Sequence, residues 1–162
     1  MEKEDLSADE KEYYKKLVKF RNSAANRFAM YTGVRITDIG PGWAMGEIKI
    51  ELHNTNPIGS VHGGCIFTLA DSVGGAAASS RKRPATTVNS GINYLNPAMA
   101  DNTKMLYAKA KERKAGKSTC VYDIEVTDQD GRLIATSTAT YFYLKGELKI
   151  CEGSLPGLGT VP

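Results

Sequence analysis

The sequence lacks several features that would mark a specialised class of protein. Its three cysteines are an odd number at wide spacing, which is not a disulfide framework, and no Cys-x-x-Cys pair indicates a metal site. No apolar run reaches the length of a membrane span, and the charged stretch 2–5 is unlike a secretory signal. We therefore expect a cytoplasmic protein without a metal, a disulfide or a membrane partner.

Charge of one sign is also scarce. The formal net charge of the 162 residues is only +3, and the basic residues that do cluster lie in 81–83 and 109–117. Few aromatic residues separate them, which disfavours a nucleic-acid partner. Phosphates of a small ligand and plainly solvated loops both remain compatible with these two clusters. A hydrophobic content of 41% is ordinary for one domain with a sizeable core.

The first half of the chain contains two predicted helices and two predicted strands. Ser7 and Glu10 form a capping box before apolar residues at helical spacing, which predicts a helix over 8–21. A second, short helix over 23–31 is expected to end at Gly33. Strands are then predicted over 34–39 and 43–52, the second with Ala44, Gly46, Ile48, Ile50 and Leu52 on one face.

The second half of the chain is strand-like after residue 83. Four strands are predicted, over 86–95, 103–113, 118–127 and 133–144. The gaps between them are short and polar, so we expect hairpins and a four-stranded meander. This order of elements predicts an α+β domain with helices on one face of an antiparallel sheet. An exposed edge strand would remain, and pairing two such edges in a dimer is a common solution.

A long apolar segment, 63–79, separates the two groups of strands. It is predicted to be a helix with almost no polar face, and such a helix is expected to be buried. Gly74 and Gly75 in its interior each cost about 1 kcal/mol relative to alanine. That cost predicts the close approach of a neighbouring element or of a substrate.

The most informative residues lie around the start of this helix. His62-Gly63-Gly64 opens it, and glycines there leave backbone N–H groups open to an incoming oxygen atom. Asp71 lies further along, in an apolar context with no cation among its helix neighbours, so we expect a raised pKa and a role as base or nucleophile. An acid that is exposed or paired at an interface is the simpler alternative. Cys65 is interpreted as a packing residue.

The spacing of Asn56, His62-Gly63-Gly64 and Asp71, with strands behind it, resembles the hotdog-fold acyl-coenzyme A thioesterases. The matching branch includes the phenylacetate-degradation thioesterases and the human thioesterase superfamily members. The resemblance covers about residues 24–145 and implies a hotdog fold, an antiparallel β-sheet wrapped around a long central α-helix. Residues 1–23 would then be an N-terminal helical extension and 146–162 a C-terminal tail.

The resemblance also implies roles in hydrolysis. Asp71 would attack the thioester directly or activate water, and Thr87 would hold that water, although β-propensity explains a threonine there equally well. Gly63 would donate its N–H to the oxyanion. Asn56 would be a second donor, and it also suits an Asx turn before a proline, which does not exclude that role. For His62, the family more often implies a role in orienting the loop by hydrogen bonds than a role as an acid or base.

The coenzyme A contacts are inferred less directly. The resemblance places the substrate against Gly64, Asn89, Ser90 and Gly91, with Arg81 or Arg83, Lys114 and Lys117 on the phosphates. Coenzyme A is part of the substrate, so no separate cofactor is implied. Relatives are commonly dimers of dimers, which implies a homo-oligomer whose active site is shared between subunits.

Two other functions compete with acyl-coenzyme A hydrolysis. A hotdog module that binds acyl-coenzyme A without catalysis would carry the same fold. A hotdog hydratase or dehydratase usually pairs a catalytic histidine with an acid in a different loop motif. The chain has only His53 and His62 and no such motif, which disfavours the hydratase.

Overall fold

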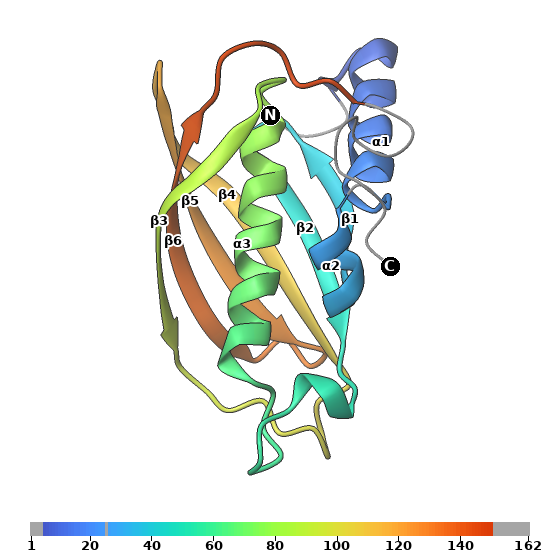
Figure 1. Cartoon of the computed structure of the whole chain (residues 1–162), viewed down its shortest axis with the longest axis vertical. Helices are drawn as coiled ribbons and strands as arrows, with labels where there is room; N and C mark the ends of the chain where they lie inside the picture. The colour runs from blue at the N-terminus through green and yellow to red at the C-terminus, as the bar shows by residue number, and fades with distance from the viewer. Residues whose placement is uncertain (1–4, 25, 151–162) are drawn as a thin grey trace.

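A curved antiparallel sheet wraps around one long helix in the computed structural model, which describes residues 5–24 and 26–150 (Figure 1). The strand order is β1-β2-β4-β5-β6-β3. The strands are β1 (Val34–Gly40), β2 (Trp43–Lys49), β3 (Ala85–Tyr94), β4 (Met105–Ala115), β5 (Thr119–Asp128) and β6 (Leu133–Tyr143). The predicted α+β arrangement is confirmed, and the strand bounds lie within a few residues of those expected.

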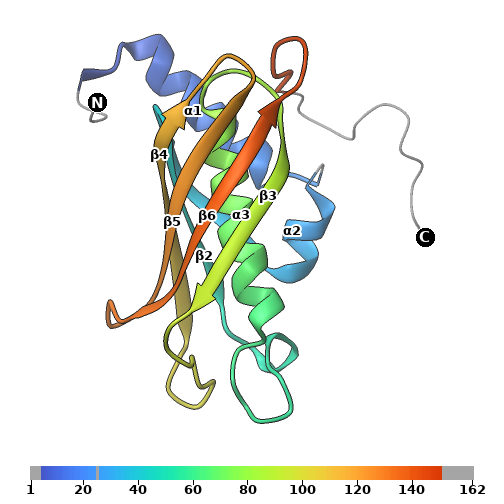
Figure 2. The same ribbon diagram turned by 90° about the vertical axis from the view of Figure 1, so that its left-hand side faces the viewer.

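The predicted four-stranded meander is wrong in one pairing. β4, β5 and β6 follow one another as expected, but β3 pairs with β6 at the far edge of the sheet, with Ser90 opposite Ala139. The connection 95–104 is too long for a tight hairpin, and its backbone bonds to the loop before the central helix instead: the Val61 N–H donates to the Ala98 carbonyl (2.8 Å). This crossing carries the chain from β3 to β4, beside β2 (Figure 2).

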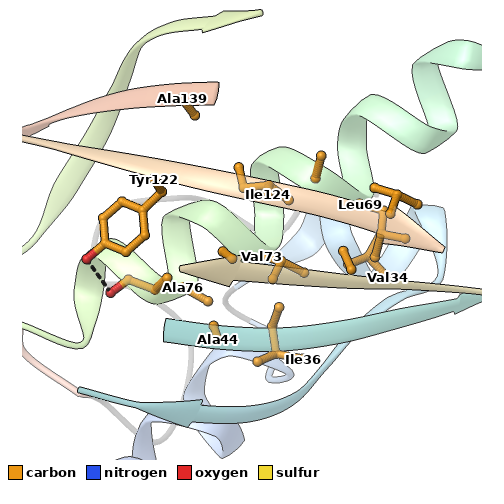
Figure 3. Packing of buried hydrophobic residues seen from close by; sticks show 14 of the residues in the cluster. Val34, Ile36, Ala44, Leu69, Val73, Ala76, Tyr122, Ile124 and Ala139 are labelled. Carbon is orange, nitrogen blue, oxygen red and sulfur yellow. Dashed lines mark hydrogen bonds between the residues drawn. The ribbon is translucent and has the colours of Figure 1, made fainter. Parts of the chain in front are cut away.

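The central helix, α3 (Gly63–Ser79), has the predicted bounds. Its buried side, which includes Leu69 and Val73, packs on the concave face of the sheet, and the Tyr122 hydroxyl donates to the Ala77 carbonyl at 3.1 Å (Figure 3). The expectation of complete burial is wrong, because the sheet covers only part of the helix. One side of α3 stays partly exposed, and we call it the open stripe: Phe67, Thr68, Asp71, Ser72 and Gly75.

Two N-terminal helices lie beside the first strand. The capping box of α1 (Ala8–Arg21) is present as predicted, and Leu17 is fully buried against the domain. The shorter α2 (Arg27–Thr32) begins four residues later than expected and ends at Gly33, which has a left-handed φ of 81°. Figure 1 shows both helices on the β1 side of the sheet. None of the helices in the described ranges has the length and apolarity to cross a bilayer.

Leu52 differs from its predicted place. β2 ends at Lys49, and a short 3₁₀ turn, η2 (Leu52–Asn54), follows it and turns the Leu52 side chain outward with 88% exposure. Part of the expected tail is ordered, since the Leu148 N–H donates to the Lys82 carbonyl (3.0 Å). The remainder of that tail, 151–162, lies outside the described residues.

The two interior glycines of α3 have different surroundings. A Cβ on Gly74 would overlap the Tyr141 hydroxyl and lie 2.9 Å from Ile124 Cδ1, whereas the nearest atom to a Cβ on Gly75 is 3.8 Å away. The close approach predicted from this pair is therefore made at Gly74, by the sheet.

Candidate active site

The first turn of α3 leaves one backbone donor open. His62 caps the helix, and its Nδ1 accepts the Gly64 N–H at 2.9 Å. The His62 carbonyl accepts the N–H groups of Cys65 (2.9 Å) and Ile66 (3.2 Å). Among the described residues, the Gly63 N–H has no acceptor. An unpaired amide at the positive end of a helix dipole is suited to bind a developing oxyanion.

Tyr94, at the end of β3, supports this turn and was not identified from the sequence. Its hydroxyl donates to the Gly63 carbonyl at 2.8 Å, and a Cβ on Gly63 would lie 3.2 Å from the Tyr94 ring. A cleft of about 300 Å³ opens between these two residues and Asn96. The alternating strand pattern gave no signal that distinguished Tyr94 from an ordinary sheet residue.

Asn56 lies in the loop that precedes the helix. Its Oδ1 accepts the N–H groups of Ile58 (3.2 Å) and Ser60 (3.0 Å), so the predicted Asx turn is present. Within the described residues, its Nδ2 has no acceptor. The loop is tied to the helix start because the His62 N–H donates to the Asn54 carbonyl at 2.7 Å. Both interpretations of Asn56 therefore remain compatible with the geometry.

Asp71 lies at the middle of the open stripe and meets Thr87 of β3. The Thr87 hydroxyl donates to Asp71 Oδ1 at 2.9 Å, and the Tyr141 hydroxyl donates to the Asp71 main-chain carbonyl at 3.3 Å. Asp71 is partly buried, so it is neither enclosed nor fully solvated. Helix rise places it about 12 Å along the axis from Gly63 of the same chain. The structure thus brings Asp71 to Thr87 but not to Gly63.

A cation near Asp71 comes from outside its helix. Arg21, at the end of α1, donates through Nη2 to the Gly75 carbonyl (2.8 Å) and to the Ser79 hydroxyl. Burial lowers the pKa of Arg21, and the nearby charges of Tyr141 and Asp71 partly oppose that shift. Burial raises the pKa of Tyr141, with a further contribution from Asp71. The expectation concerned only the neighbours of Asp71 on α3, and Arg21 lies on α1, because spacing within one helix carries no information about a side chain from another.

The predicted contacts on β3 lie on two faces of the sheet. Ser90 faces the helix, with its hydroxyl 3.2 Å from the Ser137 hydroxyl. Asn89 and Gly91 pair with Thr140 and Thr138, on the face directed away from α3. The Asn89 side chain therefore lies away from Asp71, and residues 89 and 91 can offer only their backbone to a ligand on the helix side.

The predicted phosphate-binding residues gather at the other end of the molecule. Arg81 donates to both carboxylate oxygens of Glu112 (2.8 and 2.6 Å), and this pairing raises the pKa of Arg81 and lowers that of Glu112. Lys114 and Lys117 are exposed at the end of β4 and in the turn after it. This end is about 24 Å along α3 from the His62–Gly64 turn. Within one chain, the basic residues and the His62–Gly64 turn therefore lie at opposite ends of α3 (Figure 1).

Metal chemistry has no candidate centre in the described part of the chain. No group of three or more His, Cys, Asp or Glu side chains there is arranged to hold an ion.

A sheet wrapped around a helix that opens on His-Gly-Gly and carries an acid on its open stripe defines the hotdog thioesterase class. A family model described as Thioesterase superfamily matches residues 58–135. The acyl-coenzyme A thioesterase PaaI of Escherichia coli K12 is 34% identical over 103 residues, which cover 64% of this chain and 72% of that protein. Human acyl-coenzyme A thioesterase 13 is 28% identical over 129 residues, covering 78% and 91% respectively.

Solved structures agree with the sequence matches. The E. coli PaaI protein from the phenylacetic acid degradation operon superposes with a TM-score of 0.73 at 29% identity, over 81% of this chain and 91% of that one. A hypothetical thioesterase protein with coenzyme A from Streptococcus pneumoniae TIGR4 gives 0.68 at 28% identity, over 76% and 96%. The chain belongs to the thioesterase superfamily, and its hotdog fold is confirmed.

Proposed function

We propose that this chain hydrolyses acyl-coenzyme A thioesters to the free acid and coenzyme A. The observation that carries the proposal is that one helix has both a Gly63 N–H without an acceptor in the described residues and an Asp71 carboxylate held by Thr87. Two of its relatives are named acyl-coenzyme A thioesterases, and the S. pneumoniae neighbour was solved with coenzyme A, which supports this substrate class.

In the proposed mechanism, the Gly63 N–H donates to the thioester carbonyl oxygen, and the helix dipole stabilises the charge that develops there. Asn56 Nδ2 is the second donor. Thr87 holds one oxygen of Asp71 and leaves the other to act. As a general base, Asp71 takes a proton from water while that water attacks the carbonyl carbon. The C–S bond then breaks, and the proton passes to the departing thiolate of coenzyme A.

Asp71 acting as a nucleophile is the alternative chemistry at the same site. The carboxylate would then form a mixed anhydride with the acyl group and expel the thiolate, and water would hydrolyse the anhydride. The same oxyanion donors serve both routes, and the products are identical.

We further infer that the active site is completed by a second copy of the chain. Gly63 and Asp71 are too far apart along one helix to meet the same carbonyl group. β3 is a ten-residue edge strand with an unpaired side, and Val88 on it is 61% exposed. Antiparallel pairing of two β3 edges would bring Gly63 of one copy toward Asp71 of the other. It would also bring the basic end of one copy toward the turn of the other, and two such dimers would form the expected tetramer.

Asp71→Asn tests the hydrolase. We expect thiol release from acyl-coenzyme A to fall by about a hundredfold or more, as for loss of a base or nucleophile, while the melting temperature stays close to that of the wild type. Asp101→Asn removes an exposed carboxylate that belongs to neither α3 nor β3 and is the matched control. Normal turnover by Asp71→Asn would refute the assignment, and wild-type binding of acyl-coenzyme A without thiol release would favour the non-catalytic module.

Mixing two inactive variants tests the shared site. If Asn56→Ala and Asp71→Asn each abolish turnover, random reassembly of an equal mixture restores one of the two sites in each mixed dimer. Because about half of the dimers are mixed, about a quarter of wild-type activity should return. A site built within one chain would recover nothing on mixing.

A further inference from the structure

A second cleft opens on the other side of the His62–Gly64 turn, between α2 and the N-terminal half of α3. Its volume is about 350 Å³, and it is lined by Phe28, Tyr31, His62, Gly64, Cys65 and Thr68, among others. We call it the α2–α3 cleft. Because it shares His62 and Gly64 with the helix start, whatever occupies it would lie next to the proposed oxyanion donor.

The polar groups around this cleft are largely satisfied by the protein itself. The Thr68 hydroxyl donates to the Gly64 carbonyl (2.8 Å), and His62 Nδ1 accepts the Gly64 N–H. Asn54 Oδ1 accepts the Glu51 N–H at 2.8 Å. Burial raises the pKa of the Cys65 thiol, which keeps it uncharged. No lysine or arginine lines the cleft, and the imidazole of His53 at its edge lies 3.7 Å from the Glu51 carboxylate, so what remains for a ligand is mainly apolar contact.

Two aromatic side chains form the outer wall of the cleft. Phe28 and Tyr31 lie one helical turn apart on α2, and they are 66% and 87% exposed. The opposite side of the helix is held by Ala29, which is buried. Large apolar side chains left this open, beside a cleft, have ring surface available for a ligand.

We propose that the α2–α3 cleft receives the acyl group of the thioester and that Phe28 and Tyr31 select an uncharged, apolar acyl group of medium size. The inference rests on the proposed hydrolase function. At about 30 Å³ per water-sized group, the cleft holds roughly ten non-hydrogen atoms. An octanoyl group fits that volume, a palmitoyl group exceeds it, and an acetyl group leaves most of it empty. A succinyl group would place its carboxylate in a cleft that no lysine or arginine lines, at a desolvation cost.

The test is a selectivity ratio. We expect wild-type kcat/KM to be higher for octanoyl- than for acetyl-, succinyl- or palmitoyl-coenzyme A. Phe28→Ala and Tyr31→Ala should each lower the octanoyl-to-acetyl ratio about fivefold, since each removes ring surface that only the longer chain touches. Met30→Ala is the control, because Met30 is 57% exposed on the same helix but does not line the cleft, and its ratio should match the wild type.

Thr68→Trp tests the same inference by filling the cleft with a large side chain. Filling it should lower the octanoyl-to-acetyl ratio at least as strongly as loss of the aromatic wall. The inference would be overturned if the octanoyl-to-acetyl ratio were unchanged in all three cleft variants, or if it changed equally in Met30→Ala. A wild-type preference for succinyl-coenzyme A would also overturn it.

Direct binding separates this inference from the hydrolase proposal. If the wild type releases no thiol from any thioester, the hydrolase proposal fails. Calorimetric affinities for octanoyl- and acetyl-coenzyme A would then still test the cleft with the same variants. Equal affinities for the two would refute it.

Discussion

Replacing Gly74 by alanine should destabilise the protein, although alanine is the better helix former. Gly74 lies in the interior of α3 against the sheet, and a methyl group there would overlap the hydroxyl of Tyr141. That hydroxyl cannot move freely, because it donates to the Asp71 carbonyl. The added Cβ would also lie only 2.9 Å from Ile124 Cδ1. The adjacent Gly75 is a matched control, since a methyl group there makes only an ordinary contact at 3.8 Å.

The magnitude follows from three contributions. Alanine at either position stabilises a helix interior by about 1 kcal/mol relative to glycine. At Gly74, overpacking costs about 1–3 kcal/mol, and displacing the Tyr141 hydroxyl from the Asp71 carbonyl costs about 1 kcal/mol more. We therefore expect Gly74→Ala to lower the free energy of unfolding by about 1–3 kcal/mol, and Gly75→Ala to raise it by up to about 1 kcal/mol.

Urea denaturation followed by the fluorescence of Trp43, the single tryptophan, measures both variants. Size-exclusion chromatography confirms that their assembly is unchanged. Tyr141→Phe added to Gly74→Ala removes the overlapping oxygen, so the double variant should recover part of the loss, as a double-mutant cycle measures. If Gly74→Ala were as stable as Gly75→Ala, the close approach of the sheet would not explain this glycine.

Two further predictions concern side-chain pairs. Thr87→Val should lower kcat about tenfold with little change in stability, because it removes the donor that orients Asp71; thiol release with wild-type kcat would contradict that role. Glu112→Gln should lower the free energy of unfolding by about 1 kcal/mol at pH 7, because the neutral amide still accepts from Arg81 but loses the ion pair, and the Arg81 side chain is 43% exposed. The Arg81 hydrogen bond lowers the folded pKa of Glu112 below 4.5, so this stabilisation is present above pH 4.5 and is lost as the pH falls through the folded value. Urea denaturation at pH 7 and at about pH 3 measures the loss of unfolding free energy in Glu112→Gln. Glu12→Gln, which replaces an exposed carboxylate on α1, is the control. An equal loss at both pH values would contradict the ion pair.

Local signals in the sequence predicted the helix that carries the site. The bounds 63–79 were predicted from a histidine and two glycines before a long apolar run, and the capping box predicted α1. Both signals act between residues a few positions apart, so they operate before any tertiary contact forms. The pattern of Asn56, His62-Gly63-Gly64 and Asp71 likewise indicated the family, because its spacing reflects one loop and one helix.

Contacts between distant segments were the ones that sequence reasoning missed. The pairing of β3 with β6 depends on how the connection 95–104 crosses the molecule, and strand periodicity carries no information about that partner. Tyr94 and Arg21 reach α3 from β3 and α1, 31 residues from Gly63 and 54 from Gly75. Nothing in their local patterns distinguishes them from ordinary strand and helix residues.

The sequence by itself determined the elements of this protein, its superfamily and the chemical groups available at the helix start, because capping, periodicity and short motifs are local. The tertiary structure alone decided that β3 pairs with β6, that the Thr87 hydroxyl contacts Asp71, and that Arg21 and Tyr94 reach α3. Those outcomes depend on how the sheet curves around α3, and curvature arises from the packing of all six strands against one helix.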